Sequence, residues 1–193
     1  MKPLSPSLRL QLVVFALVSA SFTNVYLTQP VLPVLAEEFG AGMVLVSFSV
    51  SAVLFGIAIA NLPFGSLSDR YPIRPLISIG GAMVATGGLI VAVTHSLPLL
   101  IAARFLQGLF IPALTTCLAA YLARSLPVER LNVVMGSYVS ATVVGGLGGR
   151  LLGGWIHPPL HWRFAFVSAA VFIIVATLVA LRWLSAQAAR SPT

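Results

Sequence analysis

Charge is scarce in this chain, and negative charge is the scarcest. Only 8% of its 193 residues are Asp, Glu, Lys or Arg, and the acidic residues number 4. An average soluble domain carries about 25% charged residues, so the composition excludes an ordinary soluble fold. The single cysteine, Cys117, excludes an internal disulfide, and its expected role is that of a small core residue.

Long uncharged runs take the place of the missing charge, and 59% of the residues are hydrophobic. A helix needs about 20 mostly apolar residues to cross a bilayer. His95, Ser96 and Pro98 supply a polar turn that divides the longest run. We therefore predict an all-α integral membrane protein, with one six-helix transmembrane domain over residues 1–193 that ends in a polar cytoplasmic tail. The predicted helices cover residues 9–36, 43–66, 75–94, 97–123, 131–155 and 163–183, and the tail covers 184–193.

The net charge of +7 comes from basic residues that are dispersed along the chain. Tracking of nucleic-acid phosphates calls for clustered Lys and Arg, so we expect no nucleic acid partner. Threading the helices from a cytoplasmic N-terminus leaves only Arg163 in an outer connection and places Arg104 and Arg150 within helices. The positive-inside rule then predicts cytoplasmic termini in a multi-pass protein of the lipid bilayer. The basic residues on the inside are Lys2, Arg9, Arg70, Arg74, Arg124, Arg130, Arg182 and Arg190.

The first predicted helix carries more polar residues than a lipid-facing anchor should. Ser21, Asn24 and Thr28 repeat at three- and four-residue spacing and form one stripe. In a membrane such a stripe faces other helices or water. Two interpretations stay open: the stripe contacts a transported solute, or it forms structural hydrogen bonds to neighbouring helices.

A short turn after the second helix concentrates charge. Asp69 can accept hydrogen bonds from helix-end amides or pair with an arginine, and Gly65 lets the helix ends approach. The stretch 65–75 resembles the signature loop G-x-L-[SA]-D-R-x-G-R-[RK]-x between helices 2 and 3 of the major facilitator superfamily. Pro72 stands where that loop usually has glycine, and Ile73 where it usually has arginine. The resemblance implies a role in the inside gate for Gly65, Asp69, Arg70 and Arg74.

Arg104 and Gln107 share a face of the fourth predicted helix, because they are three residues apart. Arg104 lies about 10 Å from the outer end of that helix at 1.5 Å per residue. The stretch Arg104-Phe105-Leu106-Gln107-Gly108 resembles the R-x-x-Q-G motif of the same superfamily. We expect solute contact or coupling chemistry there, and the alternative is that Arg104 snorkels to the outer surface. The predicted translocation residues are Arg104, Gln107, Asn24, Tyr26 and Gln29.

Glycines four residues apart in the fifth predicted helix form a smooth ridge against which another helix can pack. Their spacing resembles the helix 5 motif G-x-x-x-G-P-x-x-G-G of drug and sugar efflux antiporters, with Arg150 in place of the proline. Together with Tyr26-Leu27-Thr28-Gln29-Pro30 and Trp162-Arg163, the motif is similar to an arabinose-efflux-like branch of exporters. The predicted packing motif is Gly145, Gly149, Arg150, Gly153 and Gly154.

The resemblance implies one half of a transporter, because the superfamily holds its solute between two six-helix halves. It implies proton-coupled export of a small organic solute across a bacterial inner membrane, with a second half that is a separate chain or a second copy. The alternatives are a non-transporting fragment, or an assembly protein that docks through the glycine ridge.

Coupling chemistry is restricted by the position of the acids. No Asp, Glu or His lies within a predicted span, so the titrating group is expected in the second half, or at Glu37 or Glu38. We expect no enzyme activity, cofactor or metal, since no nucleophile has a placed base. His157 and His161 fit an interfacial turn better than a metal site.

Overall fold

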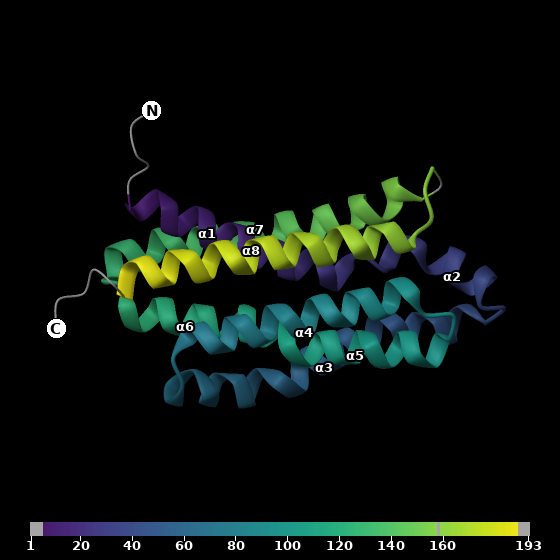
Figure 1. Cartoon of the computed structure of the whole chain (residues 1–193), viewed down its shortest axis with the longest axis horizontal. Coiled ribbons are helices and arrows are strands. Elements are labelled where there is room, and N and C mark those ends of the chain that lie inside the picture. The colour runs from purple at the N-terminus through teal and green to yellow at the C-terminus, as the bar shows by residue number, and fades with distance from the viewer. Residues whose placement is uncertain (1–5, 158, 189–193) are drawn as a thin grey trace.

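The computed structural model describes residues 6–157 and 159–188, and this part of the chain is helical apart from its connections (Figure 1). The longest helices are α3, α7 and α8, and shorter helices follow the breaks in the first and fourth spans. The α-helices are α1 (Pro6–Tyr26), α2 (Leu32–Glu38), α3 (Met43–Arg70), α4 (Ile73–Val93), α5 (Leu97–Leu114), α6 (Thr116–Ser125), α7 (Val128–Ile156) and α8 (Arg163–Ala188), and Gln29–Val31 forms a 3₁₀ turn, η1.

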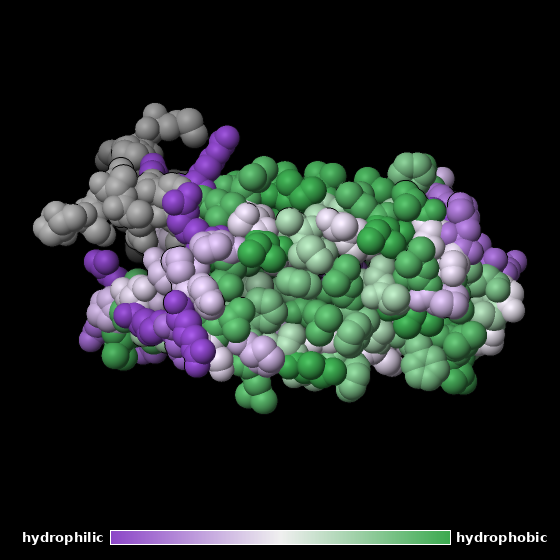
Figure 2. Space-filling view, turned by 60° about the horizontal axis from the view of Figure 1, so that its bottom comes forward, coloured by the Kyte–Doolittle hydropathy of each residue, from purple (hydrophilic) through white to green (hydrophobic). Residues whose placement is uncertain are grey.

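Six segments of the described chain are long and apolar enough to cross a membrane. A band of hydrophobic side chains covers the middle of the molecule, and hydrophilic residues gather at its two ends (Figure 2). This surface is what a bilayer requires of a multi-pass protein. The spans are Leu8–Glu38, Met43–Arg70, Ile73–Val93, Leu97–Ser125, Val128–Ile156 and Arg163–Trp183.

Two of the spans are interrupted close to prolines. The first helix stops at Tyr26, and η1 and α2 then carry Pro30 and Pro33 to the end of the span. Proline removes a backbone donor and clashes with the preceding turn, which explains the break. The fourth span breaks at Thr115, three residues after Pro112.

The helices pair in a repeated pattern. α1 packs along α7, α3 packs along α5, and α4 lies against both α5 and α8. α1 also packs on α8, so the set of contacts stays the same when spans 1, 2 and 3 are exchanged with spans 4, 5 and 6, as expected of a 3+3 inverted repeat. Glycines allow close approach both where α3 crosses α5 and where α1 crosses α7. The first three and last three spans can therefore share this arrangement without similar sequences.

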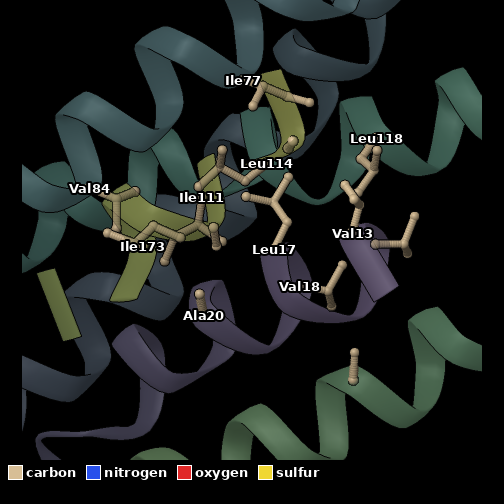
Figure 3. Packing of buried hydrophobic residues seen from close by; sticks show 14 of the residues in the cluster. Val13, Leu17, Val18, Ala20, Ile77, Val84, Ile111, Leu114, Leu118 and Ile173 are labelled. Atoms are coloured by element: carbon tan, nitrogen blue, oxygen red, sulfur yellow. The ribbon is translucent and has the colours of Figure 1, made fainter. Parts of the chain in front are cut away.

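A continuous apolar core lies between α1, α4, α5, α6 and α8 (Figure 3). Leu17 from α1 and Leu114 from α5 are fully buried at its centre, and Ile173 reaches it from α8. A second cluster, near the end predicted to face outward, surrounds the buried Trp162 and Phe166. The two clusters fix the position of the first span, on which Asn24, Tyr26 and Gln29 lie.

The helix ends differ from the sequence expectation at two places. α3 continues through Gly65 to Arg70, so most of the charged signature stretch is helical and only Tyr71 and Pro72 form the turn. α8 continues to Ala188, so the first part of the predicted tail is helical, and 189–193 lie outside the described residues.

Candidate functional site

Arg104 lies wholly inside the bundle, with no exposed surface. Its Nη2 donates to the carbonyl oxygen of Val25 at 2.7 Å, and its Nη1 donates to that of Asn24 at 2.7 Å. These carbonyls belong to the last turn of α1, where backbone acceptors lack partners within the helix. A cation at a helix C-terminus is also favoured by the helix dipole. Arg104 thus caps the break in the first span.

The same guanidinium joins two further helices. Nε donates to the carbonyl of Ser49 in α3 at 3.3 Å, and Nη1 also donates to Oε1 of Gln107 at 2.6 Å. Gln107 in turn donates from Nε2 to the carbonyl of Val84 in α4 at 2.9 Å. Gln107 lies so close to α4 that a Cβ at Gly87 would come within 2.5 Å of its Cγ. The predicted R-x-x-Q-G pair therefore connects α1, α3, α4 and α5.

Asn24 is also fully buried. Its Nδ2 donates to Ala20 in its own helix at 2.9 Å and to Ala169 in α8 at 3.3 Å. Among the described residues its Oδ1 has no hydrogen-bond partner. Of the two interpretations of the polar stripe, these contacts favour interhelical hydrogen bonding. Solute contact by Arg104, Gln107 and Asn24 stays a prediction, and in this structure all three side chains are inaccessible to a solute. Arg104 does not snorkel to the surface.

Arg150 differs from Arg104 because its side chain is exposed. Its Nε donates to Oε1 of Gln29 at 2.8 Å, and its Nη1 donates to the carbonyl of Gly146 at 3.2 Å. The guanidinium carbon lies 4.3 Å from the centroid of the Tyr26 ring, well within cation–π range. Sequence reasoning placed Tyr26 and Gln29 with Arg104, whereas the structure places them with Arg150.

The glycine ridge of α7 lies directly on the backbone of α1. A Cβ at Gly145 would be 2.4 Å from the carbonyl oxygen of Ser19, and one at Gly149 would be 2.6 Å from that of Thr23. Gly153 meets Leu27 in the same way at 2.4 Å, whereas a Cβ at Gly154 would lie no closer than 3.6 Å to any atom. The expected packing role therefore applies to three of the glycines. Because α1 already covers the ridge, it offers no free surface for docking another protein.

The signature stretch forms a clasp at the predicted cytoplasmic end. Arg124 at the end of α6 pairs with the carboxylate of Asp69 and donates to the carbonyl oxygen of Ser68 at 2.6 Å. Arg70 and Arg74 are exposed and have no ion pair within the described part of the chain. A Cβ at Gly65 would meet nothing within 4 Å, so close packing in this half does not require that glycine.

The end of the bundle that is predicted to face outward holds a polar cluster that sequence reasoning missed. Glu38 accepts hydrogen bonds from the indole of Trp162 and from the guanidinium of Arg163. Arg163 also donates to the carbonyl of Thr94 at 2.7 Å, which joins the outer ends of three spans. Glu37 and Glu38 both lie at the surface, and the side chain of Glu38 is 28% exposed while it makes these contacts. The adjacent Trp162 and Arg163 were the only sequence signal of this cluster.

A family model described as the Major Facilitator Superfamily matches residues 14–193. The chain belongs to this superfamily. Its members are membrane transporters rather than enzymes, and the three motifs on which the resemblance was based lie within the matched residues.

Relatives in the Major Facilitator Superfamily come from several bacteria. The Inner membrane transport protein YnfM of Escherichia coli (strain K12) is 28% identical over 172 residues, which are 89% of this chain and 41% of the relative. The Multidrug resistance protein B homolog of Mycobacterium tuberculosis (strain ATCC 25618 / H37Rv) is 31% identical over 131 residues, 67% of this chain and 24% of the relative. The chain spans less than half the length of each.

Solved structures show the same arrangement of helices. The proton:xylose symporter XylE superposes with a TM-score of 0.79 at 15% identity, over 94% of this chain and 46% of that chain. A bacterial homolog of the human lysosomal transporter Spinster superposes with a TM-score of 0.71 at 15% identity, over 88% of this chain and 42% of that chain. This chain therefore has the fold of half a major facilitator transporter.

Proposed function

We propose that the chain is one half of a secondary-active exporter, which moves a small organic solute by alternating access and uses a proton gradient. Transmembrane transport follows from the superfamily, and the E. coli and M. tuberculosis relatives are a transport protein and a multidrug resistance protein homolog by name. The direction of transport and its coupling to protons go beyond what the superfamily implies and are part of this proposal.

The observation that carries it is the uneven burial of the spans. In their most apolar stretches α3 is only 28% buried and α7 only 22%, whereas the other spans are 44% to 67% buried. Large apolar side chains cover the open faces, including Phe48 and Leu62 on α3 and Val143 on α7. A second six-helix half placed against α3 and α7 encloses a path between the two halves.

The path in this proposal runs along α1 where it borders α7. Tyr26, Gln29 and Arg150 supply polar groups at this border, and none of the three is fully buried. The buried Arg104 network behind them holds the broken first span in place. The solute thus passes the Arg150 side of α1 and not the Arg104 side.

Orientation and coupling complete the proposal. The clasp of Asp69 and Arg124 lies at the end of the bundle where the described chain begins and ends, and we assign this end to the cytoplasm of a bacterial inner membrane. The described acids, Glu37, Glu38, Asp69 and Glu129, lie at helix ends, so we assign the proton-binding group to the second half.

The test begins with the DNA that follows the codon for Thr193, where a six-helix reading frame supplies the second half and its absence leaves pairing of two copies. The chain alone, and the chain with that half, are expressed in bacteria that lack their own drug exporters. Cells are loaded with a panel of fluorescent organic solutes, and the rate of loss is measured with and without a protonophore. We expect export only with the second half, and only while the proton gradient lasts. Equal loss of every solute with and without the chain contradicts the proposal.

A further inference from the structure

Of Arg104 and Arg150, the two arginines that lie well inside predicted spans, Arg150 is the exposed one, and it has no carboxylate partner within the described residues. It lies six residues before the end of α7, about 9 Å along the helix axis. An arginine within the hydrocarbon is costly on insertion scales unless its charge and donors find partners. Arg104 recovers this cost with hydrogen bonds inside the bundle, whereas Arg150 leaves much of its donor capacity unused.

Three N–H groups of Arg150 are unused, two of them on Nη2 and one on Nη1. Arginine has five N–H donors. Nε is occupied by Gln29 and one N–H of Nη1 by Gly146, and the described residues offer no acceptor to Nη2. Nη1 and Nη2 form a planar fork that matches the two oxygens of a carboxylate with two parallel hydrogen bonds. The open edge is therefore suited to a carboxylate.

Neighbouring residues hold this edge in place before any ligand arrives. Tyr26 supports one face of the guanidinium at 4.3 Å, and Gln29 fixes its rotation through Nε. Gly146 leaves the necessary room, because a Cβ there would lie 3.2 Å from Cδ2 of Tyr26 and 3.6 Å from Nη1 of Arg150. A group that is already ordered loses less entropy on binding.

Apolar side chains border the charged edge. Leu147 lies three residues before Arg150 and four residues before Leu151, so on the surface of α7 it neighbours both of them. The leucines are 56% and 53% exposed. On the α1 side the ring of Phe22 stacks on Tyr26, with centroids 6.4 Å apart. A ligand that meets these surfaces combines a carboxylate with an apolar body.

We infer that Arg150, Tyr26 and Gln29 form a binding site for the carboxylate of an amphiphilic organic acid. This inference rests on the proposed transport function, since it names the class of solute that the exporter carries. The same chemistry could be supplied by an acidic side chain of the second half. Both sources place a carboxylate on the Nη1–Nη2 edge, and the experiment separates them.

The experiment measures equilibrium binding of benzoate and of its uncharged counterpart benzamide to the chain with its second half in lipid nanodiscs. We expect benzoate to bind at least about tenfold more tightly, because a charge-assisted pair contributes about 1.5 to 3 kcal/mol. Arg150→Gln removes this preference, and Tyr26→Leu weakens it. Arg130→Gln, an exposed arginine at the other end of α7, leaves it unchanged. Circular dichroism and co-purification of the halves are recorded for each variant.

Each outcome has a separate meaning. Loss of the benzoate preference in Arg150→Gln with the halves still associated identifies the solute as the source of the carboxylate. Absence of a preference in the wild type, with the halves separating in Arg150→Gln, identifies an acidic residue of the second half. If neither property depends on Arg150, or if Tyr26→Leu and Arg130→Gln behave alike, the site is refuted. Arg150-dependent binding without export in cells refutes the proposed function alone, and export without such binding refutes this site alone.

Discussion

Replacement of Gly149 by alanine tests how closely α7 lies on α1. The new Cβ would sit 2.6 Å from the carbonyl oxygen of Thr23 and 3.0 Å from its Cα, and real Cβ atoms essentially never approach below 3.0 Å. The obstructing atoms are backbone, so the side chain of Thr23 cannot relieve the contact by changing rotamer. The whole of α1 has to move away from α7 by several tenths of an ångström.

The matched control is Gly148→Ala, one residue earlier on the same helix. A Cβ at Gly148 meets only Oγ1 of Thr23, at 4.0 Å. Both variants gain up to about 1 kcal/mol of helix propensity over glycine. Only Gly149→Ala also incurs the overpacking penalty of about 1 to 3 kcal/mol. The difference in free energy of unfolding between the two variants therefore isolates the packing of α7 on α1.

The assay is thermal unfolding in detergent micelles, followed by circular dichroism. For a chain of this size 1 kcal/mol corresponds to about 2 to 4 °C in Tm. We therefore expect Gly149→Ala to melt about 2 to 12 °C below Gly148→Ala. If Gly149→Ala melts at or above the temperature of its control, the close contact between α1 and α7 is not present and the reasoning is refuted.

Three further predictions concern the polar groups. Arg104→Gln leaves buried carbonyl groups unpaired at about 1 to 3 kcal/mol each; the yield of folded protein and its Tm should fall, and an unchanged Tm contradicts the capping role. Asp69→Asn and Arg124→Gln remove an ion pair whose side chains are 70% and 46% exposed, so a double-mutant cycle of unfolding free energies should give a coupling below about 1 kcal/mol. Glu38→Gln weakens hydrogen bonds to two partners and should lower Tm by a few degrees, at about 0.5 to 1.5 kcal/mol per bond. Glu37→Gln, the same change at the adjacent exposed carboxylate, is its control, and equal melting of these two variants counts against the cluster around Glu38.

Much of the fold could be predicted from the sequence because hydropathy sets the number of spans. The six apolar runs and the glycine spacing in α7 are local patterns, and the signature stretch around Asp69 gave the family. The break after Tyr26 divides a segment that we predicted as one helix, and Pro30 and Pro33 account for it. Each of these features depends only on residues that are neighbours in the chain, so it can be recognised without knowing which helices meet.

The roles of the two intramembrane arginines could not be predicted in the same way. Two acceptors of Arg104 are backbone carbonyls 79 and 80 residues away. Every residue has a backbone carbonyl, so the sequence does not show which ones accept hydrogen bonds from Arg104. Arg150 was assigned to packing because it interrupts a run of glycines, yet the ridge turns it towards Tyr26 and away from the buried interface. Burial distinguishes the two arginines, and burial depends on which helices meet.

The most direct test of the account is the reaction of single cysteines with a membrane-impermeant, water-soluble thiol reagent. Cys117 is first replaced by serine, and cysteine is then placed at Gln29 or at Asn24 in the chain with its second half in native membranes. Gln29 borders the proposed path beside Arg150, whereas Asn24 lies fully buried beside the Arg104 network. The account predicts that Gln29→Cys is modified and that Asn24→Cys is not. Modification of Asn24→Cys as fast as Gln29→Cys, or faster, contradicts it.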